Sequence, residues 1–463
     1  MIRLSHYWKH LQRRRKVPYL FNKSSVMKRK LLLPERLMLG DGTAPFNGVY
    51  VISINGVITA AGLSVALAKV QARHPSLRAA VRNDASGAPW FEIPEVYQPI
   101  PLIIKERTSA VDWQQEVRDA WASVFNIESG PLINLTWLKG DPQSELILTF
   151  HHSMCDGGGG LMLVKEILAV LDDPDKQIGA HPAFTTLQDI VPAHILNGKQ
   201  QIFKAKLKGL FIKGALAAVS AMVNTRGKQP ISREKDYLLH WKLDRQVSAA
   251  LFQHCALQEV TVNTALCVAF LRAFKLVKGE KAMNKIICPV DIRRFIPEIR
   301  KDVIFSFGLS LELSLNNSQQ LPFWQRAKAL QTVASRKIKQ MNPYAFMLPF
   351  EYAHGGIKYM RKFLTYGKPV YDLMFSNMGK LDVPERYQHF TIDTIFSPTV
   401  IGPFSNPTTI ITSTYKGQID FSFVSNYQVL DYQDAVAIRE MAMELLTKEL
   451  PVQAPEAALS SII

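Results

Sequence analysis

Apolar side chains recur along this chain at two spacings, one typical of helices and one typical of strands. In residues 61–74 they fall three and four positions apart, which predicts an amphipathic helix that stops at Pro75. In residues 303–313 every second residue is apolar, and this alternation predicts a half-buried strand. A chain that mixes both spacings is predicted to fold as an α/β protein.

A predicted hairpin precedes the most unusual stretch of the sequence. Residues 132–139 and 145–152 are apolar runs joined by the turn residues GDPQ. The second run continues into CDGGGG and then into a predicted helix over residues 161–171. Upstream, Asp112 is expected to cap a helix with tryptophan and valine on its apolar side.

The pattern then breaks and starts again. Residues 172–236 contain DDPDK, HP, VP and a lysine-rich segment. A new series of elements follows: a helix capped by Thr261, strands near residues 284–292 and 371–377, a hairpin over 408–423 and a helix over 434–450. We therefore predict a basic N-terminal segment (1–32), an N-terminal half (33–175), a crossover linker (176–236) and a C-terminal half (237–463). The length of 463 residues suits two large halves.

The net charge of +16 is concentrated in two stretches. The first 36 residues hold eleven Lys and Arg and one acid, and residues 199–228 hold seven basic residues and no acid. The apolar run 209–223 inside the second stretch is shorter than the roughly 20 residues that span a bilayer. A solvated basic surface is one interpretation; reversible attraction to an anionic membrane or to an acidic carrier protein is the other. No nucleic-acid motif accompanies the charge, so we expect no nucleic-acid partner.

Composition adds little beyond this. The chain is 47% hydrophobic and 20% charged, as globular proteins are. Its four cysteines form no CxxC pair, which favours a reducing compartment and hence the cytoplasm, with the basic stretches as a peripheral membrane contact.

The motif HHSMCDG at residues 151–157 is the strongest candidate for chemistry. Metal binding is disfavoured, because neighbouring strand residues such as His151 and His152 point to opposite faces. A phosphate loop is disfavoured, because GGGG lacks a following GK[ST] and Asp156 would repel phosphate. Two interpretations remain: a pair of core histidines, and one histidine acting as a general base beside a loop held by Asp156.

This motif resembles the HHxxxDG motif of the condensation-domain and chloramphenicol-acetyltransferase-like superfamily of acyltransferases. The similarity extends from about residue 33 over most of the chain, through LPERLML (33–39), ARHPSLRAAV (72–81), FNIESGPLINLTWL (125–138), TVNTALCVAFLRA (261–273), PVDIRR (289–294) and SNMG (376–379). It implies two chloramphenicol-acetyltransferase-like halves that meet in a V around a central channel. A WGxG motif typical of plant alcohol acyltransferases is absent from the sequence.

The resemblance also implies roles for individual residues. The second histidine of the motif, His152, is expected to face the channel as the general base. Asp156 is expected to be structural and paired with Arg293, and Gly157 to leave room for a pantetheine arm. Three further residues are candidates for contacting substrate: His151, Asn377 and Ser413.

The implied function is transfer of an acyl group from a CoA or carrier-protein thioester to an alcohol. The acyl thioester is a co-substrate, and we expect no metal and no further cofactor. The alternatives are an amide-forming condensation catalyst, a thioesterase, and a non-catalytic protein that binds an acyl carrier or lipid. No GxSxG elbow is present, which argues against a serine hydrolase, and we expect Cys155 to be buried and inert.

Overall fold

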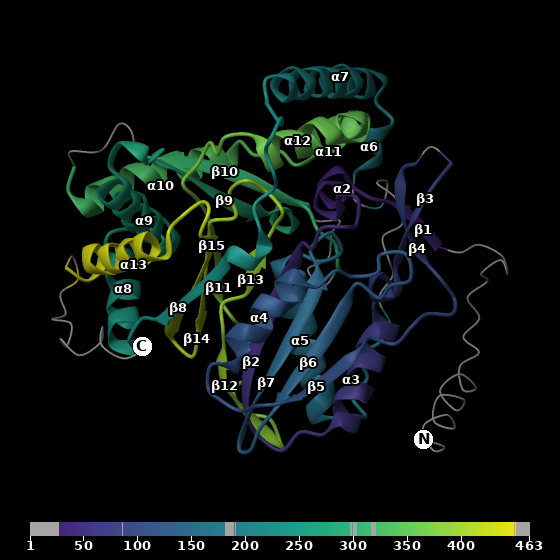
Figure 1. The fold of residues 1–463 in the computed structure, drawn as a ribbon, viewed down its shortest axis with the longest axis vertical. Coiled ribbons are helices and arrows are strands. Elements are labelled where there is room, and N and C mark those ends of the chain that lie inside the picture. Colours follow the sequence, from purple (N-terminus) through teal and green to yellow (C-terminus); the bar gives the residue numbers. More distant parts are fainter. Residues whose placement is uncertain are drawn as a thin grey trace.

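The structure is a computed structural model that describes residues 27–450, apart from 86, 181–188, 190, 297, 298, 300–302, 316–320 and 449. Most of the predicted basic N-terminal segment, residues 1–26, lies outside the described residues. The chain forms two lobes, each built on a mixed β-sheet with helices packed against it (Figure 1). The predicted two-lobed α/β fold is confirmed.

The N-terminal lobe is built on a sheet with the strand order β12-β2-β7-β6-β5. Its own strands are β2 (Asn47–Gly56), β5 (Leu102–Glu106), β6 (Ile133–Lys139) and β7 (Gln143–His151). Strands β6 and β7 are antiparallel neighbours, so the predicted hairpin is confirmed. Helices α3 (Ala60–Arg73) and α5 (Gly157–Asp172) contact each other, and α4 (Asp112–Ala122) packs on β2 and β7 through Trp113, Val117 and Trp121. A small sheet, β1-β4-β3, is attached, formed by β1 (Met27–Lys30), β3 (Ala80–Asn83) and β4 (Pro89–Ile93).

The C-terminal lobe is built on a six-stranded sheet with the order β10-β9-β11-β14-β15-β8. Its strands are β8 (Asp236–Lys242), β9 (Lys285–Asp291), β10 (Gly308–Ser314), β11 (Leu373–Lys380), β14 (Thr409–Tyr415) and β15 (Gln418–Asn426). The helices of this lobe are α8 (Arg245–Leu257), α9 (Val262–Lys278), α10 (Phe323–Lys339) and α13 (Tyr432–Thr447). Helix α9 lies at the centre of the core, and Thr261 caps it as expected by accepting a hydrogen bond from the Thr264 N–H.

Two strands from the C-terminal part of the sequence complete the N-terminal sheet. Strands β12 (Phe390–Ile395) and β13 (Thr399–Ile401) both pair antiparallel with β2. The predicted boundary at residue 237 therefore does not divide the chain into the two lobes. The segment that contains β12 and β13 lies after residue 237 but belongs to the sheet of the first lobe.

The predicted crossover contains a short helix, α6 (Ala193–Leu196), and a long helix, α7 (Lys199–Ala221). Helix α7 lies on α11 (Tyr344–Ala353) and α12 (Ile357–Tyr366) at the top of the molecule in Figure 1. Helix α2 (Leu33–Leu39) contacts α11 and α12 as well. The crossover thus runs over the outside of the helices that cap the two lobes.

Three local expectations need correction. Helix α5 begins at Gly157 rather than at residue 161, because Asp156 caps it. Asp112 is the first residue of α4 and not its cap: its carboxylate accepts hydrogen bonds from Thr108 and Ser109, which precede the helix. Of the predicted strand 303–313, only the part from Gly308 is a strand; residues 304–307 are buried but are not part of a sheet.

Candidate active site

The two histidines lie at the end of β7 and have different surroundings. His151 is the last residue of the strand, and its side chain is 2% exposed. Its Nδ1 accepts hydrogen bonds from the Ser153 hydroxyl at 2.8 Å and from the Ser153 N–H at 3.2 Å. Burial lowers the pKa of His151 to about 4, and the neighbouring His152 contributes to this shift. The ring of Phe125 lies against it edge-on. These contacts place His151 in the core, so substrate contact by His151 is not favoured by its position.

His152 is partly exposed and is held in one orientation. Its Nδ1 lies 2.9 Å from the carbonyl oxygen of Cys155. A carbonyl oxygen can only accept, so Nδ1 carries the proton and Nε2 keeps its lone pair. Burial lowers the pKa of His152, although the hydrogen bond to Cys155 and the charge of Asp156 oppose this shift. The ring is therefore neutral at neutral pH, with an unprotonated Nε2.

Phe46 packs against His152, a contact that the sequence analysis did not predict. Its ring meets the imidazole edge-on at 5.3 Å, and its carbonyl accepts a hydrogen bond from the backbone N–H of His152 at 2.8 Å. Phe404, from the C-terminal part of the chain, packs edge-on against Phe46 at 5.5 Å. Nothing in the local sequence indicates these contacts, because Phe46 lies at the edge of an ordinary apolar strand.

Asp156 joins the start of α5 to the C-terminal lobe. Its Oδ1 accepts a hydrogen bond from the Gly159 N–H at 2.8 Å, and its Oδ2 lies 2.6 Å from Nη1 of Arg293. Arg293 also contacts Asp291 at 3.2 Å, donates to the Val303 carbonyl and lies over the ring of Phe305. Burial works to lower the pKa of Arg293, but Asp156 and Asp291 outweigh it and the pKa is raised. The pairing implied by the resemblance is present, and Asp291 is a second carboxylate that the sequence analysis missed.

The glycines after Asp156 allow close packing within the first turn of α5. A Cβ at Gly160 would lie 2.6 Å from the Tyr50 ring, and a Cβ at Gly157 would lie 3.1 Å from Met378 Sδ. The Tyr50 hydroxyl donates to the Gly157 carbonyl at 2.6 Å. The space beside Gly157 is therefore lined by a methionine of β11, and room there for a pantetheine arm stays a prediction.

Cys155 has the properties of a core residue. It is fully buried, and burial together with the charge of Asp156 raises the pKa of its thiol well above the ordinary value. A thiol that stays protonated is a poor nucleophile. The other three cysteines are also free and buried.

Asn377 and Ser413 are not brought together with His152 by any hydrogen bond among the described residues. Asn377 Oδ1 accepts from the Gly379 N–H at 2.8 Å, at a register shift between β11 and β14. Ser413 is 1% exposed, and its hydroxyl pairs with that of Ser397 at 2.9 Å. Ser397, in the β12–β13 segment of the first lobe, in turn binds Asp420, so Ser413 belongs to a buried network between the two lobes.

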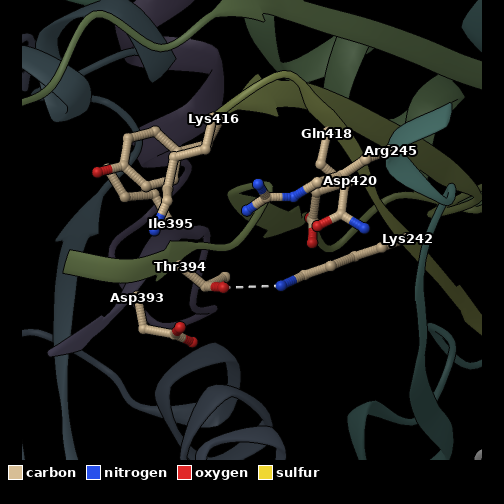
Figure 2. A pocket seen from close by; sticks show the side chains of 9 residues that line it. Lys242, Arg245, Asp393, Thr394, Ile395, Lys416, Gln418 and Asp420 are labelled. Atoms are coloured by element: carbon tan, nitrogen blue, oxygen red, sulfur yellow. Dashed lines mark hydrogen bonds between the residues drawn. The ribbon is translucent and has the colours of Figure 1, made fainter. Parts of the chain in front are cut away.

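A small polar pocket lies where β12 meets the C-terminal sheet (Figure 2). Lys242 of β8 donates to the Thr394 hydroxyl of β12 at 2.7 Å, and burial lowers the pKa of this lysine. Lys416 pairs with Glu385 at 2.7 Å, and Asp420 pairs with His240 at 2.7 Å. Lys242, Lys416 and Asp420 thus already have protein partners. The hydrogen bond between Lys242 and Thr394 joins the two lobes at this pocket. Its lining consists of Lys242, Arg245, Asp393, Thr394, Ile395, Tyr415, Lys416, Gln418 and Asp420.

Among the described residues, no group of three or more His, Cys, Asp or Glu side chains is arranged to hold a metal ion. At the motif, a neutral imidazole lies beside a fixed ion pair.

Comparison with known sequences finds a family match in the N-terminal part of the chain. The family model "Condensation domain" matches residues 37–180. A plipastatin synthase of Bacillus subtilis is 26% identical over 144 residues, which are 31% of this chain and 5% of that protein. N-(5-amino-5-carboxypentanoyl)-L-cysteinyl-D-valine synthase of Amycolatopsis lactamdurans is 24% identical over 319 residues, which are 66% of this chain and 8% of that protein. The chain thus matches only a small part of these much longer relatives.

Comparison with solved structures covers nearly the whole chain. Trichothecene 15-O-acetyltransferase from Fusarium sporotrichioides superposes with a TM-score of 0.68 at 13% identity, over 93% of this chain and 98% of that one. The first condensation domain of the CDA synthetase gives a TM-score of 0.65 at 14% identity, over 94% and 100%. Polyketide synthase associated protein 5 from Mycobacterium tuberculosis gives 0.62 at 16% identity, over 92% and 99%.

Family match, fold and motif agree. Residues 37–180 match the condensation-domain family model, and the chain as a whole has the fold shared by the condensation-domain and O-acetyltransferase structures on which it superposes.

Proposed function

We propose that this chain transfers an acyl group from a thioester to the hydroxyl of an alcohol, with His152 as general base. The observation that carries the proposal is the hydrogen bond from His152 Nδ1 to the Cys155 carbonyl, because it leaves Nε2 unprotonated. A positioned base of this kind contributes about 10²–10⁴-fold to the rate of a proton transfer.

The reaction needs no covalent intermediate on the enzyme. Nε2 of His152 takes the hydroxyl proton while the alcohol oxygen attacks the thioester carbonyl carbon. The C–S bond of the tetrahedral intermediate then breaks, and the imidazolium returns its proton to the departing thiolate. The products are one ester and one thiol, and the histidine ends as it began.

The ion pair between Asp156 and Arg293 holds the loop that carries the base. Asp156 fixes the start of α5 and, through Arg293, the relation of this loop to the C-terminal lobe. Both residues are therefore positioning residues. Asn377 stays a candidate donor to substrate, since among its described contacts only Oδ1 is engaged.

The similar proteins support a choice of acyl donor and acyl acceptor. Condensation domains work with thioesters bound to a carrier protein, which favours a donor carried on a phosphopantetheine arm, and CoA is the other source of the same thioester. The fold shared with an O-acetyltransferase supports an alcohol acceptor. Amide formation is the second candidate, because one sequence relative is named for a product that contains amide bonds. We place the reaction in the cytoplasm, consistent with four free cysteines.

The test is product analysis with defined thioesters. The protein is incubated with a series of acyl-CoA and acyl-carrier thioesters, each with a primary alcohol or a primary amine, and products are identified by mass spectrometry. We expect ester formation with equimolar free thiol. Amide formation with the amine alone would assign the second candidate, and thiol release with free acid alone would identify a thioesterase.

A matched variant separates catalysis by this site from background transfer. His152→Asn keeps an N–H donor for the Cys155 carbonyl but has no base, so ester formation should fall while the fold persists. Equal turnover by wild type and His152→Asn would contradict the assignment of the base.

A further inference from the structure

Helix α7 exposes a continuous apolar surface. Five of its large apolar side chains are more than half exposed, although such side chains are usually buried. We call this surface the α7 outer face: Phe203 (62% exposed), Leu207 (52%), Leu210 (64%), Phe211 (77%) and, at the helix end, Met222 (85%).

Helical spacing puts these residues on one side. Phe203, Leu207 and Leu210 follow each other at intervals of four and three, so they line one stripe, and Phe211 lies beside it. The opposite side of the helix carries Ala205, Gly209 and Ser220, which are buried.

The orientation of α7 is fixed by that buried side. A Cβ at Gly209 would lie 2.6 Å from the Cβ of Tyr352 on α11, so the two helices are in close contact there. Helix α7 lies at the outside of the molecule, above α11 and α12 (Figure 1). The outer face therefore points away from the described protein.

Lysines border the outer face on both sides. Helical spacing places Lys204 and Lys208 along one border, and Lys199, Lys206 and Lys213 along the other. All five are exposed, and no ion pair joins them to an acid within the described part of the chain. Residues 199–228 contain no acidic residue at all. Lysines in this arrangement can lay their stems on an apolar surface and extend their charges to anionic groups.

We propose that the α7 outer face binds the surface of an anionic lipid bilayer, with α7 lying in the plane of the interface. An apolar stripe flanked by basic side chains is the pattern of interfacial helices. Among the described residues no single helix is long and apolar enough to cross a bilayer; only the bent pair α8 and α9 passes that test together. The proposal is independent of the proposed reaction, since it concerns a surface that contains none of the motif residues.

The charge of the α7 outer face favours an anionic bilayer over two other binding partners, a second copy of the chain and its own N-terminal segment. A second copy of the chain docking through the same face would bring two sets of lysines together without acids between them. The N-terminal segment of this chain carries the same sign of charge, with eleven basic residues and one acid in the first 36. A phospholipid surface offers both apolar chains for the phenyl rings and phosphates for the lysines.

The test is co-sedimentation of the full chain with phosphatidylcholine vesicles, with and without phosphatidylglycerol. We expect binding to the anionic vesicles that weakens with salt, since the Debye length falls to about 3 Å at 1 M. The double substitution Phe203→Ser, Phe211→Ser should lower the partition coefficient at least tenfold, because two phenyl rings are no longer transferred from water into lipid. The matched control Val96→Ser, Leu257→Ser removes two apolar side chains that are 90% and 76% exposed elsewhere, and should bind as wild type does.

A local probe identifies the surface that touches lipid. Because the four native cysteines are buried, a single engineered cysteine can be labelled selectively with a polarity-sensitive dye. Dye on Phe211→Cys should shift to the blue with anionic vesicles, and dye on Leu257→Cys should not.

Three results would overturn the proposal. One is no binding of wild type to anionic vesicles at low salt. Another is equal binding by wild type and the Phe203, Phe211 double variant, which would assign the binding to another basic region. The third is dimerisation in solution that the same double substitution abolishes, which would make the outer face a contact between two copies. A failed transfer assay has no bearing on any of the three.

Discussion

Arg293 Nη1 lies 2.6 Å from Asp156 Oδ2 and so connects the start of α5 in one lobe to the segment after β9 in the other. The arginine side chain is only 5% exposed, so its charge depends on the carboxylates beside it. Since α5 also starts at Asp156, one side chain sets both the beginning of a helix and the contact between the lobes.

Asp156→Ala should lower the free energy of unfolding by about 3–5 kcal/mol, because it leaves a buried guanidinium with Asp291 as its remaining acid. Urea denaturation measures this. In a double-mutant cycle with Arg293→Ala, the combined loss should be smaller than the sum of the single losses. Strictly additive losses would show that the two side chains do not interact.

Asp156→Asn is the matched control for the charge. The amide oxygen can still accept from the Gly159 N–H, but it carries no charge for Arg293. A stability between those of wild type and Asp156→Ala is expected; a stability equal to that of wild type would mean that the cap alone matters.

His152 should control the acidic limb of the activity profile. In the proposed reaction the unprotonated form is the base, so kcat/KM should rise with pH and level off above the pKa. Since burial lowers that pKa, the midpoint should lie below the ordinary value of 6.5. His152→Ala should lower turnover by about 10²–10⁴-fold and remove the acidic limb.

The comparison with His151 makes this assignment specific. His151→Asn retains an acceptor for the Ser153 hydroxyl and should keep most of the turnover and the same pH profile. A dead His151→Asn beside a fully active His152→Ala would reverse the roles of the two histidines.

His151 should instead affect stability at acidic pH. Its pKa is about 4 in the folded protein, against an ordinary value of 6.5, so between these values the unfolded chain binds a proton that the folded chain does not. Stability should therefore fall as pH drops from 6.5 to 4, by about 3 kcal/mol from this group alone. Unfolding free energies of wild type and His151→Asn across this range check the prediction, since the variant should lack that part of the slope.

The first turn of α5 should tolerate a methyl group at one glycine and not at another. A Cβ at Gly160 would lie 2.6 Å from Tyr50 and 2.8 Å from Phe150, so Gly160→Ala should destabilise the protein by about 1–3 kcal/mol. At Gly158 the nearest atom would be 3.6 Å away, so Gly158→Ala should be neutral or stabilise the helix by up to about 1 kcal/mol. Similar melting temperatures for both variants would contradict this packing.

Local patterns predicted the elements whose partners are near in sequence. The β6–β7 hairpin and helices α3 and α9 follow from apolar spacing, turn residues and a capping threonine. The pair of Asp156 with Arg293 could be expected only through the family resemblance, since 137 positions separate the two residues.

Other features depend on tertiary contacts that no local pattern records. Four consecutive glycines are poor helix formers, yet they begin α5 because Asp156 caps the helix. At Gly160 the rings of Tyr50 and Phe150 occupy the position where a Cβ would lie. Residues 304–307 alternate like a strand and are buried, yet they form none, because alternation does not specify whether a neighbouring strand pairs with the backbone. The position of Phe46 beside His152 depends on how strands pair, which single-residue spacing does not specify.

The pairing of β12 and β13 with β2 has a consequence for synthesis of the chain on the ribosome. Gly56 ends β2 and Phe390 begins β12, so 333 residues are translated between the two partners. At a translation rate of about 5–20 residues per second, β12 is synthesised roughly 20 to 70 s after β2, and this edge of β2 stays unpaired during that time. Until then the nascent first lobe presents an unpaired edge of a buried strand, which is a template for association with other chains. Newly made protein should therefore need shielding by a chaperone at this edge until β12 and β13 have emerged.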